Sequence, residues 1–275
     1  MQRIIFDSWG QMCNRLWEYL DQVAWAYKKQ GKVYSLFWDY SLEDFDQLRN
    51  CSYIKFPLYI KFRQDSFIAR LYRRVLYAIL CNRSLQKVYS SQFFKKRGFV
   101  SGRDILYQRE HYPEVWNDIK YLFAPNKSIS DRIDQHFADV RLHNPDCLIV
   151  GVHIRRGDYK EFCNGQYYYN DEEYAGFMRE VVKMMESNVL FFISSNETID
   201  RAHFNGLKIL DIRNKKPAED MYSLTACDYI MGPYSSFSSW ASFYGKIPYC
   251  RLDRHMVFTK DKFKIVESFG RSMTK

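Results

Sequence analysis

The second half of the chain alternates short apolar runs with amphipathic stretches. From about residue 148 onward the apolar runs are LIVGVHI, NVLFFIS, LKILDI, DYIMG and IPYCRL. Between them, the stretches 170–187, 218–227 and 236–245 carry apolar residues at helical spacing. Strands that alternate with helices in this way predict a parallel, doubly wound sheet.

Capping residues and apolar stripes support two of these helices. Asn170 can cap the first helix with Glu173 three residues later, and Ser235 or Ser236 can cap the last one. Each helix has an apolar face: Tyr174, Phe177, Met178, Val181, Val182 and Met185 in the first, and Phe237, Trp240, Ala241 and Tyr244 in the last. Both are expected to be crossover helices between parallel strands.

The first half begins with the same alternation of strands and helices, which is not continued after about residue 38. RIIF and KVYSLFW read as strands around a helix at 12–29, with the stripe Met12, Leu16, Tyr19, Val23 and Tyr27. Residues 39–125 are mixed, with a basic helix near 65–81, and a helix at about 129–141 leads into the second half. We therefore expect two α/β lobes with a cleft between them, an N-terminal lobe at 1–142 and a C-terminal lobe at 143–275.

Composition indicates the cellular compartment of the protein and the charge of its binding partner. The seven cysteines are scattered without a CxxC pair, which argues against a zinc site or a disulfide framework and favours a reducing compartment. The apolar run at the N-terminus is too short for a signal peptide, and no window is long enough to span a membrane. We expect a soluble intracellular protein. Its net charge of +9 indicates an anionic partner: nucleic acid, a membrane surface or a phosphorylated small molecule.

The run LIVGVHI ends in a charged cluster, Arg155, Arg156, Gly157 and Asp158. Ligands of open α/β sheets bind beyond the carboxyl ends of the strands, which is where this cluster is expected. Arginines grip phosphate bidentately and can neutralise a departing diphosphate. The alternative is a structural ion pair between one of the arginines and Asp158.

Two further turns could contribute to a phosphate site. After Gly232, the residues Ser235, Ser236 and Ser238 begin a helix whose N–H groups and hydroxyls could cradle phosphate, or could simply cap that helix. After the first strand, Gly10 allows a tight turn and Asn14 could donate a hydrogen bond to a ligand. The first turn lacks the GxGxxG dinucleotide fingerprint.

These motifs together resemble the α-1,2-fucosyltransferase family. HIRRGDY at 153–159 is similar to its HxRRGDY signature, GQMCNRLW to its opening GGLGNQMF-type loop, and CDYIMGPYSSFSSW to its closing stretch. FFISSNE at 191–197 resembles the turn that borders the nucleotide. Cys13 and Arg15 stand where the family has glycine and glutamine, which leaves the acceptor and the exact sugar open.

The resemblance implies a two-lobed GT-B fold, GDP-fucose as donor, inverting transfer to a glycan, and no required metal. Arg155 and Arg156 would hold the diphosphate, and His153 and Asp220 or Asp228 would lie near the nucleoside. Ser235, Ser236 and Phe237 would line the β-phosphate pocket, with Asn14 facing the donor. A terminal galactose of a bacterial surface polysaccharide is the implied acceptor; a related transferase using another GDP-sugar or acceptor is the alternative.

An inverting transfer also needs a base for the acceptor hydroxyl. Asp158 is the first candidate and Glu161 the second, although Asp158 could instead orient Arg155. A rival signal is the D-x-D sequence at 44–46, a form that holds a divalent cation in other nucleotide-sugar transferases.

The basic stretch allows two interpretations and one rival function. FIARLYRRVLYAIL has Phe67, Leu71, Val75 and Ile79 on one stripe with arginines beside it, so it is either an ordinary amphipathic helix or one that lies on an anionic membrane. The second interpretation would place a cytoplasmic protein peripherally at the inner membrane face, near lipid-linked acceptors. A basic nucleic-acid-binding protein is the alternative of another class, with YSSQFFKKRGFVSGR as its best segment.

Overall fold

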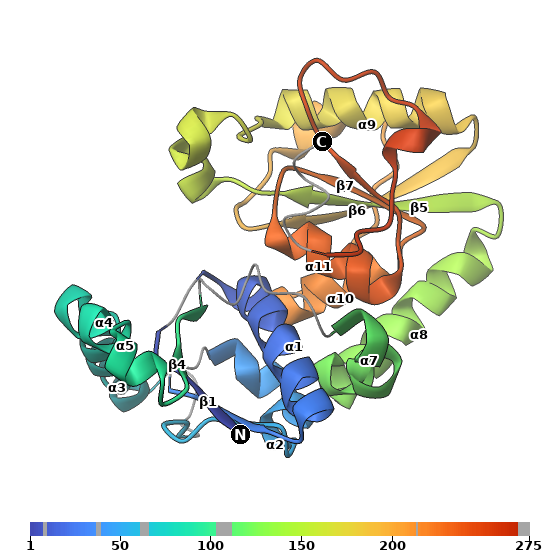
Figure 1. Ribbon diagram of the computed structural model, residues 1–275. Helices are drawn as coiled ribbons and strands as arrows, with labels where there is room; N and C mark the ends of the chain where they lie inside the picture. The colour runs from blue at the N-terminus through green and yellow to red at the C-terminus, as the bar shows by residue number, and fades with distance from the viewer. Residues whose placement is uncertain (8–9, 37–39, 61–65, 103–111, 213, 269–275) are drawn as a thin grey trace. The chain divides into compact units, whose positions relative to one another are not determined.

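The computed structural model describes residues 1–275 except 8–9, 37–39, 61–65, 103–111, 213 and 269–275. The chain divides into two compact units, Met1–Asn126 and Lys127–Lys275 (Figure 1). Helix α8 (Lys127–His143) therefore groups with the second unit, whereas the sequence pattern placed most of it at the end of the first.

The first unit is built on a parallel sheet with the order β3-β2-β1-β4. Its strands are β1 (Gln2–Ile5), β2 (Lys32–Ser35), β3 (Ile54–Lys55) and β4 (Phe99–Val100). Helix α1 (Met12–Lys29) connects β1 to β2, and its apolar stripe is buried through Leu16, Leu20 and Val23. The predicted bounds of this helix are confirmed.

Short helices fill the rest of the first unit. They are η1 (Tyr40–Asp44), α2 (Asp46–Asn50), α3 (Phe67–Leu80), α4 (Arg83–Tyr89), α5 (Gln92–Lys95), α7 (Tyr112–Ile119) and η2 (Lys120–Phe123). Helices α3, α4 and α5 form the connection from β3 to β4.

The second unit carries a parallel sheet with the order β6-β5-β7-β8. The strands are β5 (Cys147–Ile154), β6 (Asn188–Ser195), β7 (Tyr229–Gly232) and β8 (Tyr249–Arg251). Strands β5 and β6 pair over their whole length, from Cys147 opposite Asn188 to Ile154 opposite Ser195. The predicted parallel sheet is confirmed, and β5 lies at its centre.

The crossover helices of the second unit have the expected positions. They are α9 (Asp171–Met185), α10 (Pro217–Thr225) and α11 (Ser236–Gly245), with the short turns η3 (Gly157–Lys160), η4 (Phe162–Gly165), η5 (Arg201–Phe204) and η6 (Lys260–Lys262). The capping box at α9 is confirmed, since Asn170 accepts from the Glu173 amide and Glu173 accepts from the Asn170 amide. Of the two serines considered for α11, Ser235 is the cap.

One predicted strand is wrong. The run LKILDI makes only an isolated bridge between Ile209 and Phe191 of β6. Two backbone hydrogen bonds, from Phe191 to Lys208 and from Leu210 to Phe191, hold it at the sheet edge. Its apolar side chains Leu207 and Ile209 are only partly buried against the core, so the apolar pattern reflects this packing without a full ladder.

Among the helices that the structure describes, we find none whose length and apolar character would suffice to cross a membrane. All seven cysteines are free thiols.

Candidate functional site

The second sheet has its topological switch point between β5 and β7. From β5 the chain crosses to β6 on one side of the sheet, and then returns to β7 and β8 on the other side. Connections that leave two neighbouring parallel strands in opposite directions open a crevice at their carboxyl ends, where ligands of doubly wound sheets bind. The charged cluster after β5 and the serine-rich start of α11 after β7 both lie at this edge.

A buried hydrogen bond joins these two strand ends. The Nδ1 atom of His153, the penultimate residue of β5, lies 2.7 Å from the hydroxyl of Ser238 in the first turn of α11. Burial, together with the charge of Arg155, lowers the pKa of His153 to about 3, so the ring is neutral. Gly232 permits this close approach, because a Cβ at that position would lie 2.9 Å from the His153 carbonyl oxygen.

The N-terminus of α11 presents its amides at the same edge. The Ser235 hydroxyl accepts from the Phe237 amide, at 3.1 Å, and the Ser239 hydroxyl donates to the Ser235 carbonyl, at 2.8 Å. Ser235 is buried, whereas Ser236 and Phe237 are half-exposed. The positive end of the helix dipole and half-exposed residues in the first turn make this terminus suited to an anion.

Arg155 forms an ion pair with an exposed carboxylate. Its guanidinium pairs with Asp158 at 2.7 Å, with 15% of the Arg155 side chain and 64% of the Asp158 side chain exposed. It also lies 5.4 Å from the ring of Tyr159. An ion pair with so exposed a carboxylate contributes little stability, so an incoming phosphate can compete for Arg155.

Arg156 is committed to internal partners. Its side chain is buried, pairs with Asp171 and donates from Nε to the Tyr169 carbonyl at 3.2 Å. Burial tends to raise the pKa of Asp171, but hydrogen bonds from Arg156 and from the Asp200 amide outweigh it and hold that pKa below its usual range. The two adjacent arginines of the motif therefore have different surroundings, which the sequence alone did not distinguish.

Asp220 and Asp228 lie at opposite ends of the second sheet. Asp220, on α10, interacts with Ser194 at the carboxyl end of β6 and accepts from Asn214 at 3.0 Å. Burial raises the pKa of Asp220 to about 6, with the hydrogen bonds from Asn214 and Ser194 acting against it. Asp228 precedes β7 and accepts from the Ile149 amide and from Arg141. Of these two candidates, the structure brings only Asp220 to the carboxyl edge.

Two residues that shape this edge, Asn196 and Tyr159, have no separate role predicted from the sequence. The Asn196 side chain accepts from the Arg156 amide at 2.8 Å and donates to the Arg156 carbonyl at 3.4 Å. The hydroxyl of Tyr159 donates to the Tyr234 carbonyl at 2.6 Å, which ties the turn after β5 to the loop before α11. Both lie within the quoted motifs, SSNE and RGDY, so the motifs were the available signal.

A family model decides the classification. The model described as glycosyl transferase family 11 matches residues 77–247, which include the ends of β5, β6 and β7 and the start of α11. The chain belongs to glycosyl transferase family 11. The family that the three motifs indicated is thus confirmed.

Comparison with solved structures confirms the expected GT-B-like class of fold for this family 11 glycosyltransferase. A structure of POFUT1 in complex with GDP matches with a TM-score of 0.53 and 10% identity, over 89% of this chain and 93% of that one. A mutant of Arabidopsis thaliana FUT1 in complex with GDP matches with a TM-score of 0.51 and 11% identity, over 92% of this chain and 70% of that one. POFUT1 in complex with GDP-fucose gives 0.51 and 10%, over 89% and 93%. A sequence search of curated proteins finds no match.

The remaining predicted site residues of the transferase lie on loops or in the first unit. Asp158 belongs to η3 and Glu161 directly follows it, and both are exposed. Asn14 is half-buried on α1, with its side chain packed against Gly10. Gly10 has a φ of 64°, and a Cβ there would lie 1.8 Å from the Asn14 amide nitrogen, so the turn requires glycine.

The first unit of the transferase also has a switch point, between β1 and β4. Asp7, after β1, accepts from the Ser101 hydroxyl at 2.7 Å and the Gly102 amide at 2.6 Å, after β4. Glu18 of α1 is fully buried beside Gly102. Burial and the charge of Asp7 raise its pKa to about 8, against the opposing charge of Arg15. No motif in the sequence indicated that Asp7 and Glu18 lie together.

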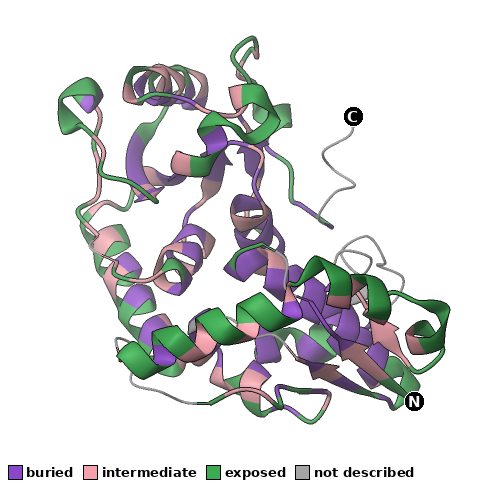
Figure 2. Ribbon diagram, turned by 90° about the vertical axis from the view of Figure 1, so that its left-hand side faces the viewer, coloured by how far each residue is buried: buried purple, intermediate pink, exposed green. Residues whose placement is uncertain are grey.

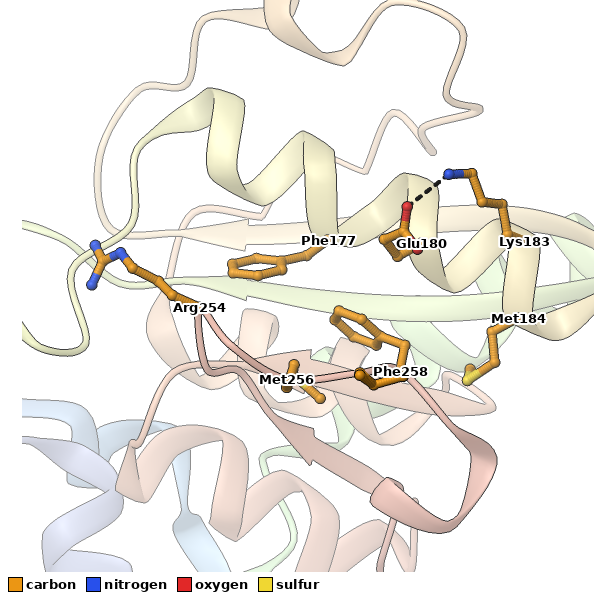
Figure 3. Close-up of a pocket in the computed structure, with 8 residues that line it drawn as sticks. Phe177, Glu180, Lys183, Met184, Arg254, Met256 and Phe258 are labelled. Atoms are coloured by element: carbon orange, nitrogen blue, oxygen red, sulfur yellow. Dashed lines mark hydrogen bonds and ion pairs between the residues drawn. The ribbon is translucent and has the colours of Figure 1, made fainter.

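Two other features of the transferase lie apart from the switch point of the second unit. A groove of about 520 Å³ follows α9, where Phe177 and Met184 face Met256 and Phe258 (Figure 3). His153 is not among the residues that line this groove. In the D-x-D sequence, Asp46 pairs with Arg49, and the described part of the chain contains no group of three or more potential metal ligands.

Proposed function

We propose that this protein transfers L-fucose from GDP-fucose, with inversion and without a metal cofactor, to a hydroxyl group of a glycan. The acceptor we favour is the 2-hydroxyl of a terminal galactose in a bacterial surface polysaccharide. The observation that carries this proposal is the switch point of the second unit, where Arg155 and the N-terminus of α11 lie at adjacent strand ends joined by His153 and Ser238. The neighbours solved with GDP and GDP-fucose support the choice of donor.

In this proposal the diphosphate binds between Arg155 and the first turn of α11. Arg155 binds a phosphate through guanidinium N–H groups beside those that hold Asp158, and the N-terminus of α11 faces a second phosphate oxygen. Ser235, which accepts from the Phe237 amide, and His153, which contacts Ser238, fix the helix end. As the bond between C1 and oxygen breaks, negative charge grows on the leaving diphosphate. A guanidinium and a helix N-terminus compensate that charge, which is why no metal is required.

Arg156 acts in this proposal as a positioning residue. Its pairing with Asp171 and the two hydrogen bonds of its backbone to Asn196 fix the turn that carries Arg155. Asp220, at the carboxyl end of β6, accepts a hydrogen bond from the nucleoside. That Asn14 faces the donor stays a prediction from the GQMCNRLW motif.

The acceptor proton goes to a carboxylate of the loop after β5. The pairing of Asp158 with Arg155 favours an orienting role for Asp158, because its carboxylate holds the guanidinium in place for the donor. We therefore assign the base to Glu161, which is exposed one residue after η3. We place the protein in the reducing cytoplasm, which its seven free thiols support.

A thermal-shift series tests the donor. GDP and GDP-fucose should raise the unfolding temperature, because a ligand that binds only the folded state stabilises it in proportion to occupancy. UDP-sugars should not raise it, and Arg155→Ala should abolish the GDP shift while Lys160→Ala, which removes an exposed cation of the same loop, should keep it. A shift with GDP-mannose equal to that with GDP-fucose would contradict the choice of sugar, and equal shifts with UDP-sugars would contradict the donor class.

A further inference from the structure

The positive charge of this protein is concentrated in one segment of the first unit. Residues 66–102, which we call the basic segment, contain no aspartate or glutamate. They contain eight basic residues, namely Arg70, Arg73, Arg74, Arg83, Lys87, Lys95, Lys96 and Arg97. The segment thus accounts for nearly all of the net charge of +9. Such a concentration indicates one surface for an anionic partner.

The basic segment also exposes an unusual amount of apolar surface. Of the fifteen large hydrophobic residues that are exposed in the described part of the chain, eight belong to it: Phe67, Ile68, Leu71, Val75, Tyr77, Ile79, Val88 and Phe93. Figure 2, which views the side where α3, α4 and α5 lie in Figure 1, shows these helices largely exposed. Such a concentration of exposed apolar residues in one segment indicates an interaction site.

Helix α3 arranges the two kinds of residue in adjacent stripes. Phe67, Leu71, Val75 and Ile79 follow one another at intervals of four, so they form one exposed face, and all are between 48% and 71% exposed. Arg70 and Arg74, also four apart and exposed, run beside this face. Only Ala69 and Leu80 of the helix are buried, on the opposite face. The apolar stripe predicted from the sequence is therefore turned outward rather than into the core.

The basic segment is anchored to the sheet from beneath. The Tyr72 hydroxyl donates to the Leu58 carbonyl at 2.9 Å. The ring of Tyr89 stacks on Phe99 of β4, with centroids 5.6 Å apart, and Phe94 packs edge-on against Phe99 at 4.9 Å. The helices of the basic segment are thus packed against the first unit, and the apolar stripe of α3 is exposed in the folded unit.

We propose that the outer face of the basic segment, led by α3, docks on an anionic membrane surface. An apolar stripe flanked by arginines is the arrangement of helices that lie in the interface, with apolar side chains among the acyl chains and cations at the headgroups. A second copy of this chain fits poorly, because two such faces would bring only positive charges together. Nucleic acid fits less well, because three of the four residues of the α3 stripe, Leu71, Val75 and Ile79, are aliphatic and offer no ring for a base to stack on.

This docking does not depend on the proposed function, although it would hold the enzyme where lipid-linked acceptors lie. Sedimentation of the full chain with vesicles tests it. We expect binding to vesicles of phosphatidylcholine and phosphatidylglycerol in equal parts, at least about tenfold weaker binding to pure phosphatidylcholine, and loss of binding as salt is raised.

Two double variants on α3, each with a matched control elsewhere, test whether vesicle binding depends on this helix or on charge and apolar surface in general. Leu71→Gln with Val75→Gln keeps helix propensity and should weaken vesicle binding at least about tenfold; Leu142→Gln with Val257→Gln, at exposed positions elsewhere, should not. Arg70→Glu with Arg74→Glu should abolish binding, whereas Lys32→Glu with Lys208→Glu, with the same change of charge at other exposed sites, should weaken it only slightly. Circular dichroism and thermal melting establish that each variant is folded.

Several outcomes would overturn the proposal. One is equal binding by the stripe variants and their controls. Another is binding of an oligonucleotide, but of no vesicle, that Arg70→Glu with Arg74→Glu removes. A third is a dimer in gel filtration that the Leu71→Gln, Val75→Gln pair dissociates while the wild type leaves vesicles unbound.

Discussion

The imidazole of His153 and the hydroxyl of Ser238 meet at 2.7 Å beneath the carboxyl edge of the second sheet. This contact holds the carboxyl end of β5 against the first turn of α11, although the two residues are 85 positions apart in the chain. Because both side chains are buried, the contact fixes the spacing between Arg155 and the N-terminus of α11.

Acid should destabilise the protein through His153. The pKa of this residue is about 3 in the folded protein and near 6.5 in the unfolded chain, so the unfolded chain binds the proton first. The stability that the neutral ring contributes is fully present above about pH 6.5 and is lost as the pH falls toward 3. Urea unfolding at stepped pH should show a smaller loss of unfolding free energy for His153→Asn than for the wild type. Identical pH dependence in the two proteins would show that His153 is not the titrating group.

Glu18 should have the opposite dependence on pH. Its folded pKa of about 8 lies above the ordinary 4.5, so between these values the unfolded chain releases the proton first and the folded state loses stability as the pH rises. Glu18→Gln, which cannot ionise, should therefore unfold at a higher temperature than the wild type at pH 8. Near pH 4 the difference should be smallest. Thermal melts across this range measure it, and a constant difference at every pH would contradict the assignment.

Substitution of Arg155 should mainly weaken GDP binding, whereas substitution of Arg156 should mainly lower stability. Arg155→Ala should weaken GDP binding at least about a hundredfold with little change in unfolding temperature, since its partner Asp158 is exposed. Arg156→Ala should cost about 3 kcal/mol of stability, because Asp171 loses its buried partner. Calorimetric titration with GDP and denaturant unfolding of both variants measure the two effects. A large loss of stability in Arg155→Ala and of GDP affinity alone in Arg156→Ala would show that Arg156, and not Arg155, binds the diphosphate.

Two glycines of the second unit should respond oppositely to alanine. At Gly232 a Cβ would meet the His153 carbonyl at 2.9 Å and the Ser238 hydroxyl at 3.2 Å, so Gly232→Ala should separate β7 from β5 and lower both stability and GDP affinity. At Gly176, within α9, a Cβ would meet nothing within 4 Å. Gly176→Ala should therefore stabilise the protein by about 0.5–1 kcal/mol. Denaturant unfolding of both variants tests the pair; similar effects at the two sites would contradict the close approach at Gly232.

Replacing the two loop carboxylates, Asp158 and Glu161, should change different kinetic constants. If Glu161 takes the acceptor proton, Glu161→Gln should lower kcat at least about a hundredfold and leave the KM for GDP-fucose nearly unchanged. Asp158→Asn should mainly raise that KM, because Arg155 loses its orienting partner. Initial rates of fucose transfer to a galactose-terminated acceptor measure both. A larger loss of kcat in Asp158→Asn than in Glu161→Gln would return the base to Asp158.

Local patterns determined much of this molecule in advance. The helix at 12–29 and the Asn170 capping box depend on spacing and on neighbours within one turn, so the sequence contains all that specifies them, whereas the cap of α11 was left open between Ser235 and Ser236. The alternation of strands and helices likewise specified the second sheet, and three separated motifs indicated the family. LKILDI misled because an apolar pattern records packing and cannot show whether a full strand partner exists.

Only the tertiary structure decided which residue of each candidate pair lies at the site. Arg155 and Arg156 are adjacent, and their environments differ because only Arg156 is paired with Tyr169, just before α9, and with Asp171, the first residue of α9. Asp220 and Asp228 differ because α10 begins at one edge of the sheet and β7 at the other. Helix α3 shows the same limit, since its period defines an apolar face but not what covers it. A pattern fixes which side chains share a face, whereas contacts between distant segments fix what that face meets.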